Sequence, residues 1–189
     1  MPPIGDVSTR ELTWTRAGAL QGTYELRAGA ELVATARGLQ WWGARAVVEA
    51  GDSCWTFRRV GFWHPRVTVR VVGSETDLAT FTARGMGRGM LDPSPTRRFQ
   101  RVATIFSPTN PIQWTWQQTD GTPLVLIRPY GLMKIRGKVE ITPAAATLPE
   151  LDLLVTLGWY LLPFSWYRLA ILLRGVIEGV QAVDIPPPP

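Results

Sequence analysis

The sequence has very little of the chemistry that catalytic and metal sites require. It holds one cysteine, Cys54, and one histidine, His64, among 189 residues. A single cysteine excludes an internal disulfide bond, and one Cys with one His is too few for a zinc site of the usual ligand number. Nothing in the sequence orients His64 as a base for Cys54, and no serine lies in a nucleophile-elbow motif. We therefore expect no enzymatic activity, no metal and no cofactor.

Lysine is also scarce, because Lys134 and Lys138 are the only two. Arginine supplies the remaining basic residues, and 15 carboxylates leave a net charge of +5. Arginine is well suited to phosphate and to planar stacked contacts, so the composition permits an anionic partner. The alternative is that these arginines form solvated strand faces. The nine tryptophans are unusually many, and indole rings occur both in cores and at membrane interfaces.

Helical periodicity is missing from the first 142 residues or so, and strand periodicity takes its place. Between Lys134 and Ile141, charged residues alternate with apolar ones, as expected of a half-buried strand. Trp55 and Phe57 alternate with Thr56 and Arg58 in the same way. Turn signals separate such runs at hairpin spacing: Ala28-Gly29, Gly51-Asp52, Gly73-Ser74 and Asp120-Gly121. The pattern predicts a mainly β fold, an antiparallel β-barrel or curled sheet formed by residues 1–147.

A dense basic window of the chain contains Arg97, Arg98 and Arg101. It follows residues 84–95, which are rich in Gly and Pro and which we interpret as a loop. This segment has no G-x-G-x-x-G motif, so it gives no indication of a nucleotide cradle. If the protein has an anionic partner, the three arginines are the residues that we expect to bind it.

The character of the sequence changes after Pro143. Thr147-Leu-Pro-Glu150 has the form of a capping box, and it predicts a helix over residues 148–174. Between Leu151 and Leu173 the charged residues are Asp152 and Arg168, so this helix has no polar stripe and is either enclosed by protein or placed in lipid. A plug inside the barrel and a membrane anchor both remain open. The residues that would carry either role are Leu154, Leu157, Trp159, Leu161, Phe164 and Trp166. Residues 175–189 end in four prolines and predict an extended tail.

Three segments together resemble one known superfamily. They are Cys54-Trp-Thr-Phe-Arg-Arg59, Gly61-Phe-Trp-His-Pro-Arg-Val67 and Trp114-x-Trp116-x4-Gly121-x2-Leu124-Val125, all ahead of the apolar C-terminal segment. This arrangement is similar to the superfamily of tubby-like, LURP-one-related and scramblase-like proteins, particularly its small bacterial members. The resemblance implies a closed β-barrel threaded by an apolar helix. In the tubby branch, Lys and Arg on the barrel exterior bind phosphoinositide head groups, but none of those binding residues is matched here position by position.

These observations favour a non-enzymatic, lipid-interacting barrel apposed to a membrane. The alternative is an accessory structural subunit of a larger membrane-protein complex, held by its apolar C-terminal segment and proline tail. Nucleic acid ranks last as a partner, because Trp55 and Phe57, the aromatic residues interleaved with arginine, lie on faces that the alternation buries. Residues 1–16 show no basic stretch followed by an apolar one, so we expect the protein on the cytoplasmic side, at the face of the membrane.

Overall fold

The structure is a computed structural model that describes residues 1–18, 22–39, 45–61, 66–84, 88–94, 97–107, 110–130 and 136–162. Within these residues the chain forms a short 3₁₀ helix (η1, Ile4–Val7), twelve β-strands and one α-helix (α1, Leu151–Tyr160). The strands are β1 (Leu12–Arg16), β2 (Tyr24–Ala28), β3 (Glu31–Arg37), β4 (Arg45–Ala50), β5 (Ser53–Val60), β6 (Arg66–Val71), β7 (Ala79–Ala83), β8 (Arg88–Ser94), β9 (Arg97–Ser107), β10 (Asn110–Gln118), β11 (Pro123–Tyr130) and β12 (Arg136–Ile141).

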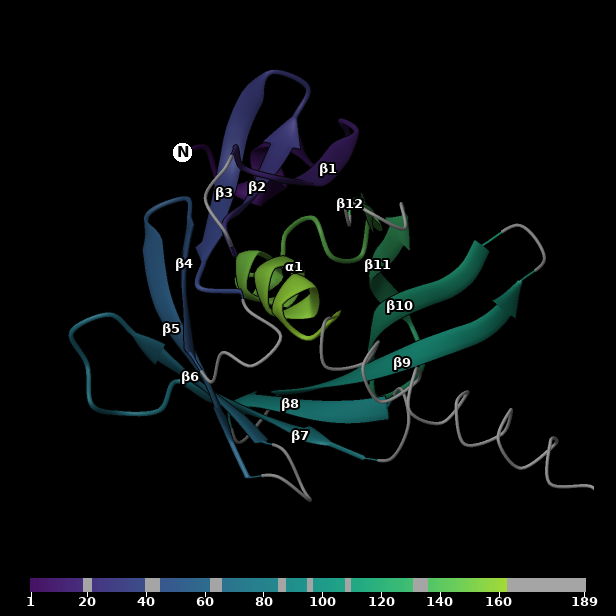
Figure 1. Ribbon diagram of the computed structural model, residues 1–189. Helices are drawn as coiled ribbons and strands as arrows, with labels where there is room; N and C mark the ends of the chain where they lie inside the picture. The colour runs from purple at the N-terminus through teal and green to yellow at the C-terminus, as the bar shows by residue number, and fades with distance from the viewer. Residues whose placement is uncertain are drawn as a thin grey trace, which may run out of the picture.

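Each strand pairs antiparallel with the strands before and after it in the sequence, and β1 pairs with β12 to close the barrel. In the closing pair, Leu12 lies opposite Val139 and Trp14 opposite Gly137. Among the twelve strands that the structure describes, closure leaves no edge unpaired, which removes the hazard of edge-to-edge association. The predicted mainly β fold, an antiparallel barrel followed by a C-terminal helix, is confirmed (Figure 1).

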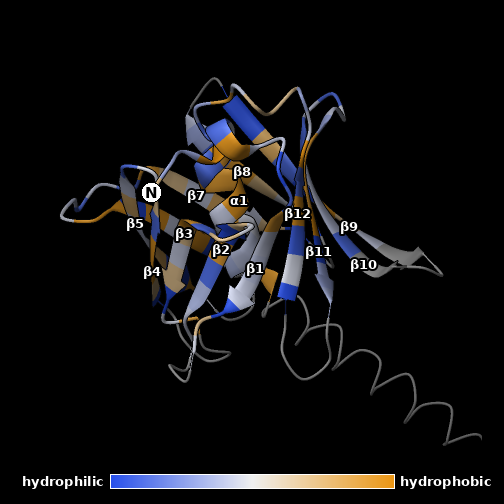
Figure 2. Ribbon diagram, turned by 90° about the horizontal axis from the view of Figure 1, so that it is seen from above, coloured by the Kyte–Doolittle hydropathy of each residue, from blue (hydrophilic) through white to orange (hydrophobic). Residues whose placement is uncertain are grey.

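Side-chain alternation determines which residues face the interior. In β5, Trp55 and Phe57 are buried whereas Arg58 is exposed, and in β12 Gly137 and Val139 are buried between exposed Arg136, Lys138 and Glu140. The same period-two pattern appears as alternating hydrophilic and hydrophobic bands along the strands in Figure 2. The hydrophobic core therefore lies inside the ring of strands, and the outer wall is polar.

Helix α1 occupies the middle of this ring (Figures 1 and 2). Its side chains are buried on every face, with Leu154, Val155 and Leu157 at 0% exposure. Thr156 is equally buried, but its hydroxyl donates to the backbone carbonyl of Asp152 at 2.7 Å, so this hydroxyl is satisfied within the helix. An all-apolar helix is stable here because the strands surround it with apolar side chains.

The capping box predicted at Thr147 does not form. The helix begins at Leu151 with Glu150 in the N-cap position and without a side-chain cap. The Glu150 carboxylate instead accepts hydrogen bonds from Arg97 at 2.8 and 2.9 Å, so it does not reach back to the backbone of Thr147. Asp152, in the first turn, accepts from the backbone N–H of Ile4 at 3.1 Å and ties the helix start to η1. The predicted start at residue 148 is therefore three residues early.

The prediction of a loop over residues 84–95 is wrong for residues 88–94, which form β8. Gly89 is required in this strand because the Phe81 ring occupies the space that a Cβ atom would fill. Pro93 is accommodated where the register between β8 and β9 shifts, between Leu91 and Ser94. Glycine and proline, which normally indicate loops, here mark a close approach and a bulge within a strand.

Candidate functional site

The barrel has two ends, which we name by the path of the chain. At the entry rim the chain enters α1, since Glu150 there pairs with Arg97, the first residue of β9. At the exit rim it leaves α1, since the Trp159 ring lies 5.5 Å from that of Tyr24, the first residue of β2. Because the strands alternate in direction, β1, β3, β5, β7, β9 and β11 all end at the exit rim.

The predicted basic cluster is divided between two faces of β9. Arg97 and Arg98 are exposed at the entry rim, where they pair with Glu150 at 2.8 Å and with Asp92 at 3.1 Å. Arg101 shares the inward face with Phe99 and is 4% exposed. Because successive residues of a strand point to opposite faces, Arg98 faces away from Arg101. Arg97 has the same parity as Arg101 but is exposed because it begins the strand at the rim, so the three arginines do not form one surface. Two of them are neutralised by carboxylates and the third is inside.

The guanidinium of Arg101 stacks over the indole ring of Trp114, 3.7 Å from the ring centroid. Burial lowers the pKa of Arg101 to about 9, which still leaves the side chain protonated at neutral pH. A stacked cation–π contact in a desolvated place stabilises the wall between β9 and β10. Arg101 therefore packs in the interior of the barrel.

The predicted plug residues of α1 lie deep in the barrel. Leu154 and Leu157 are fully buried, and Trp159 and Leu161 are 3% and 4% exposed. Phe164 and Trp166, together with residues 163–189, lie outside the described residues. The Trp159 ring stacks on Trp14 of β1 with the centroids 5.3 Å apart and the planes 6° apart. These contacts join the helix directly to the barrel wall.

Two glycines let α1 approach the strands closely. A Cβ atom on Gly158 would meet the side chain of Ile127 in β11 and would lie 2.8 Å from Nε1 of Trp116 in β10. A Cβ atom on Gly137 of β12 would collide with the ring of Trp159. The fit between helix and wall is therefore tight on two sides.

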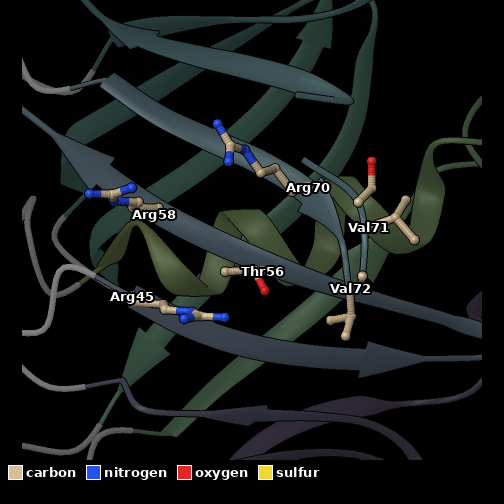
Figure 3. Close-up of a pocket in the computed structure, with 8 residues that line it drawn as sticks. Arg45, Thr56, Arg58, Arg70, Val71 and Val72 are labelled. Carbon is tan, nitrogen blue, oxygen red and sulfur yellow. The ribbon is translucent and has the colours of Figure 1, made fainter. Parts of the chain in front are cut away.

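A groove crosses the outer wall over β4, β5 and β6. We name it the wall groove; its volume is about 510 Å³ and it is lined by Arg45, Thr56, Arg58, Arg70, Val71, Val72, Gly73 and Ser74. Figure 3 shows the side chains of Arg45, Thr56, Arg58 and Arg70 on three neighbouring strands, with α1 behind them. Register explains the gathering, because Arg45 lies opposite Arg58 and Thr56 lies opposite Arg70. Three cations and the Thr56 hydroxyl thus share one surface.

The wall groove has unbalanced positive charge. Arg70 pairs with Asp77, but neither Arg45 nor Arg58 has an ion pair with any residue that the structure describes. Like charges directly opposite each other on neighbouring strands are destabilising, and Glu49, further along β4, already pairs with Arg37 at 3.3 Å. The arrangement suits an anion that lies between the two guanidinium groups and accepts charge-assisted hydrogen bonds. Val71 and Val72, 46% and 51% exposed, place apolar surface beside the cations.

A second groove lies over β8, β9 and β10. It is also lined by three arginines, but Arg101 among them is buried and stacked on Trp114, and the backbones of the other two, Arg84 and Arg88, are hydrogen-bonded to each other at 2.8 Å. The amides of Gln117 and Gln100 bond to each other along its floor at 3.2 Å. The polar groups of this floor therefore satisfy one another, and the wall groove is the stronger candidate for an anion.

Sequence reasoning missed the wall groove because its arginines are far apart in the chain. The alternation in β5 did predict that Arg58 faces outward. What brings Arg45 and Arg70 beside it is strand register, which single-sequence patterns do not give.

The described residues contain little that could carry catalysis. No group of three His, Cys, Asp or Glu side chains gathers as a metal site within them, and His64 lies outside them. Cys54 is half-buried, and burial, followed by the charge of Glu49, raises the pKa of its thiol. The more reactive thiolate form is therefore disfavoured at neutral pH.

In the part of the chain that the structure describes, no helix has both the length and the apolar character needed to cross a membrane. Comparison of the chain with protein-family models, with curated proteins and with solved structures finds no match.

Proposed function

We propose that the protein is a non-enzymatic barrel that is apposed to a membrane and binds anionic lipid through the wall groove. The observation that carries the proposal is the cross-strand pair Arg45–Arg58, two exposed guanidinium groups opposite each other with no carboxylate partner in the described residues. A phosphate group matches this pair, because each guanidinium can donate two parallel hydrogen bonds to it. Thr56 supplies a hydroxyl beside them.

A lipid fits better than a free anion because the groove combines charge with apolar surface. Exposed Val71 and Val72 form its wall at the turn that follows β6. A ligand with a phosphate and an adjoining apolar part would contact both regions of the groove. The resemblance to tubby-like proteins also implies a closed barrel around an apolar helix. This shared architecture supports a relationship to that superfamily, which we include in the proposal.

Binding to vesicles tests the proposal. Wild-type protein is mixed with vesicles of phosphatidylcholine alone or with added phosphatidylserine or phosphorylated phosphatidylinositol, and the bound fraction is measured by co-sedimentation. The variant Arg45→Gln/Arg58→Gln should bind anionic vesicles about 30-fold more weakly, at roughly 1 kcal/mol for each arginine near a charged surface.

The matched control is Arg97→Gln/Arg98→Gln, which removes the same charge from arginines that already have carboxylate partners. It should retain most of the binding, and circular dichroism should show both variants folded. Equal weakening of both variants would assign the effect to net charge alone. Failure of the wild type to bind any anionic vesicle would refute lipid binding.

A further inference from the structure

The two ends of the barrel differ sharply in charge. Exposed arginines lie at the exit rim, each at a strand end or within two residues of it, and none has an ion pair within the described residues: Arg16, Arg45, Arg58, Arg66, Arg84, Arg88 and Arg136. They come from β1, β4, β5, β6, β8 and β12 and from the residue that follows β7. They therefore occupy two arcs of the rim, one over β12 and β1 and a longer one from β4 to β8, and do not form one patch.

The carboxylates are at the other end. Among those in the described residues, only Glu25 lies nearer the exit rim, and it is engaged by Arg27 at 2.8 Å. Those nearer the entry rim are Asp6, Glu11, Glu31, Glu49, Asp52, Glu75, Asp77, Asp92, Asp120, Glu140, Glu150 and Asp152. Arginines near the entry rim, such as Arg10, Arg70, Arg97 and Arg98, all have carboxylate partners. The barrel thus carries its uncompensated positive charge at one end.

Cations spread over two arcs of the rim suit an extended anionic surface. A small ligand could contact only two or three of these arginines, whereas a planar surface can approach all of them together. We infer that the barrel docks end-on, with the exit rim against a bilayer that contains anionic lipid and the entry rim facing away. This inference rests on the proposed lipid binding and adds the face and the orientation that the lipid surface takes.

The path of the chain is consistent with this orientation. Helix α1 runs toward the exit rim, and Leu162 is the last residue that the structure describes there. The helix thus ends at the rim that carries the unpaired arginines, and arginines near an anionic leaflet each contribute favourably to binding.

Two exposed apolar residues allow the orientation to be measured. Val60, the last residue of β5, is 50% exposed at the exit rim, and Leu78, just before β7, is 44% exposed at the entry rim and does not line the wall groove. In a Cys54→Ser background, Val60→Cys or Leu78→Cys is labelled with an environment-sensitive fluorophore. On vesicles of phosphatidylcholine and phosphatidylserine, the probe at position 60 should shift to the blue and be quenched by nitroxide lipids. The probe at position 78 should not respond.

A charge-matched pair of variants tests the same inference independently. Arg66→Gln/Arg88→Gln/Arg136→Gln neutralises the exit rim without touching the wall groove, whereas Arg10→Gln/Arg97→Gln/Arg98→Gln removes the same charge from the entry rim. The exit-rim variant should bind these vesicles on the order of 100-fold more weakly than the wild type. The entry-rim variant should change little.

The outcomes separate the inference from the proposed function. Equal responses of the two probes, or a response at position 78 alone, would overturn end-on docking while leaving lipid binding intact. Equal weakening by both triple variants would do the same. Tighter binding to duplex DNA or RNA than to vesicles, lost in the exit-rim variant, would assign the exit-rim arginines to nucleic acid and overturn the inference. Absence of wild-type binding to anionic vesicles would refute both proposals.

Discussion

The contact between Gly137 and Trp159 gives a direct measure of how tightly the barrel holds α1. A Cβ atom added at position 137 would collide with the six-membered part of the Trp159 indole ring, lying 3.1 Å from Cη2 and 3.2 Å from Cε3. The ring cannot move aside because it is stacked on Trp14. Overpacking of a core typically costs about 1–3 kcal/mol. We expect Gly137→Ala to lower the melting temperature by several degrees, at roughly 2–4 °C for each kcal/mol in a chain of this size.

Trp159→Leu removes the ring but leaves an apolar side chain. It should cost less than the ~3–5 kcal/mol of a complete truncation to Ala. In Gly137→Ala/Trp159→Leu the added methyl group no longer meets the ring, so the double variant should be more stable than the sum of the single losses by about 1–2 kcal/mol. Urea denaturation followed by far-UV circular dichroism gives the three free energies of unfolding.

Gly89→Ala is the matched control for this cycle. Gly89 is also a strand glycine in a crowded place, but its Cβ atom would meet Phe81 and not Trp159. Gly89→Ala and Trp159→Leu should therefore combine additively. If the Gly137 cycle is additive as well, the helix does not pack against β12 as described, and the account of α1 as a tightly enclosed helix fails.

Two further predictions concern ionisation. Burial, and then the charge of Asp6, raises the pKa of Asp152 despite the hydrogen bond from Ile4. The neutral carboxyl therefore stabilises the fold fully below the ordinary carboxyl pKa, and this stability is lost as the pH rises through the raised pKa. Asp152→Asn should therefore gain stability relative to the wild type between about pH 4 and neutrality. Asp120→Asn should show the opposite trend, because hydrogen bonds from Thr122 lower the pKa of Asp120. A stability difference between Asp152→Asn and the wild type that does not change with pH would contradict this reasoning. For Cys54, the rate of alkylation by iodoacetamide should rise with pH through a midpoint above that of a free cysteine, because burial raises the pKa of its thiol. A midpoint at or below that of a free cysteine would show that burial does not control this pKa.

Local sequence patterns predicted the strands well where one face is buried and the other solvated. The alternation between Lys134 and Ile141 corresponds to β12, Arg136–Ile141, with the expected residues inward among those described. Patterns failed where glycine and proline have a tertiary role. The ring of Phe81 explains Gly89, and the irregular pairing of β8 with β9 explains Pro93. Both are tertiary contacts that local patterns do not contain, so the sequence alone predicts a loop at these residues.

The sequence by itself determined the mainly β class, the inward and outward faces of strands, and the presence of an apolar helix after them, because these follow from periodicity over a few residues. Tertiary structure decided which charges stand together. It separated Arg101 from Arg97 and Arg98, placed Arg45 opposite Arg58, and collected unpaired arginines at the end of the barrel where α1 points. Strand register and barrel closure determine which arginines lie together, and both depend on the pairing of whole strands. The candidate site could therefore be identified only from the tertiary structure.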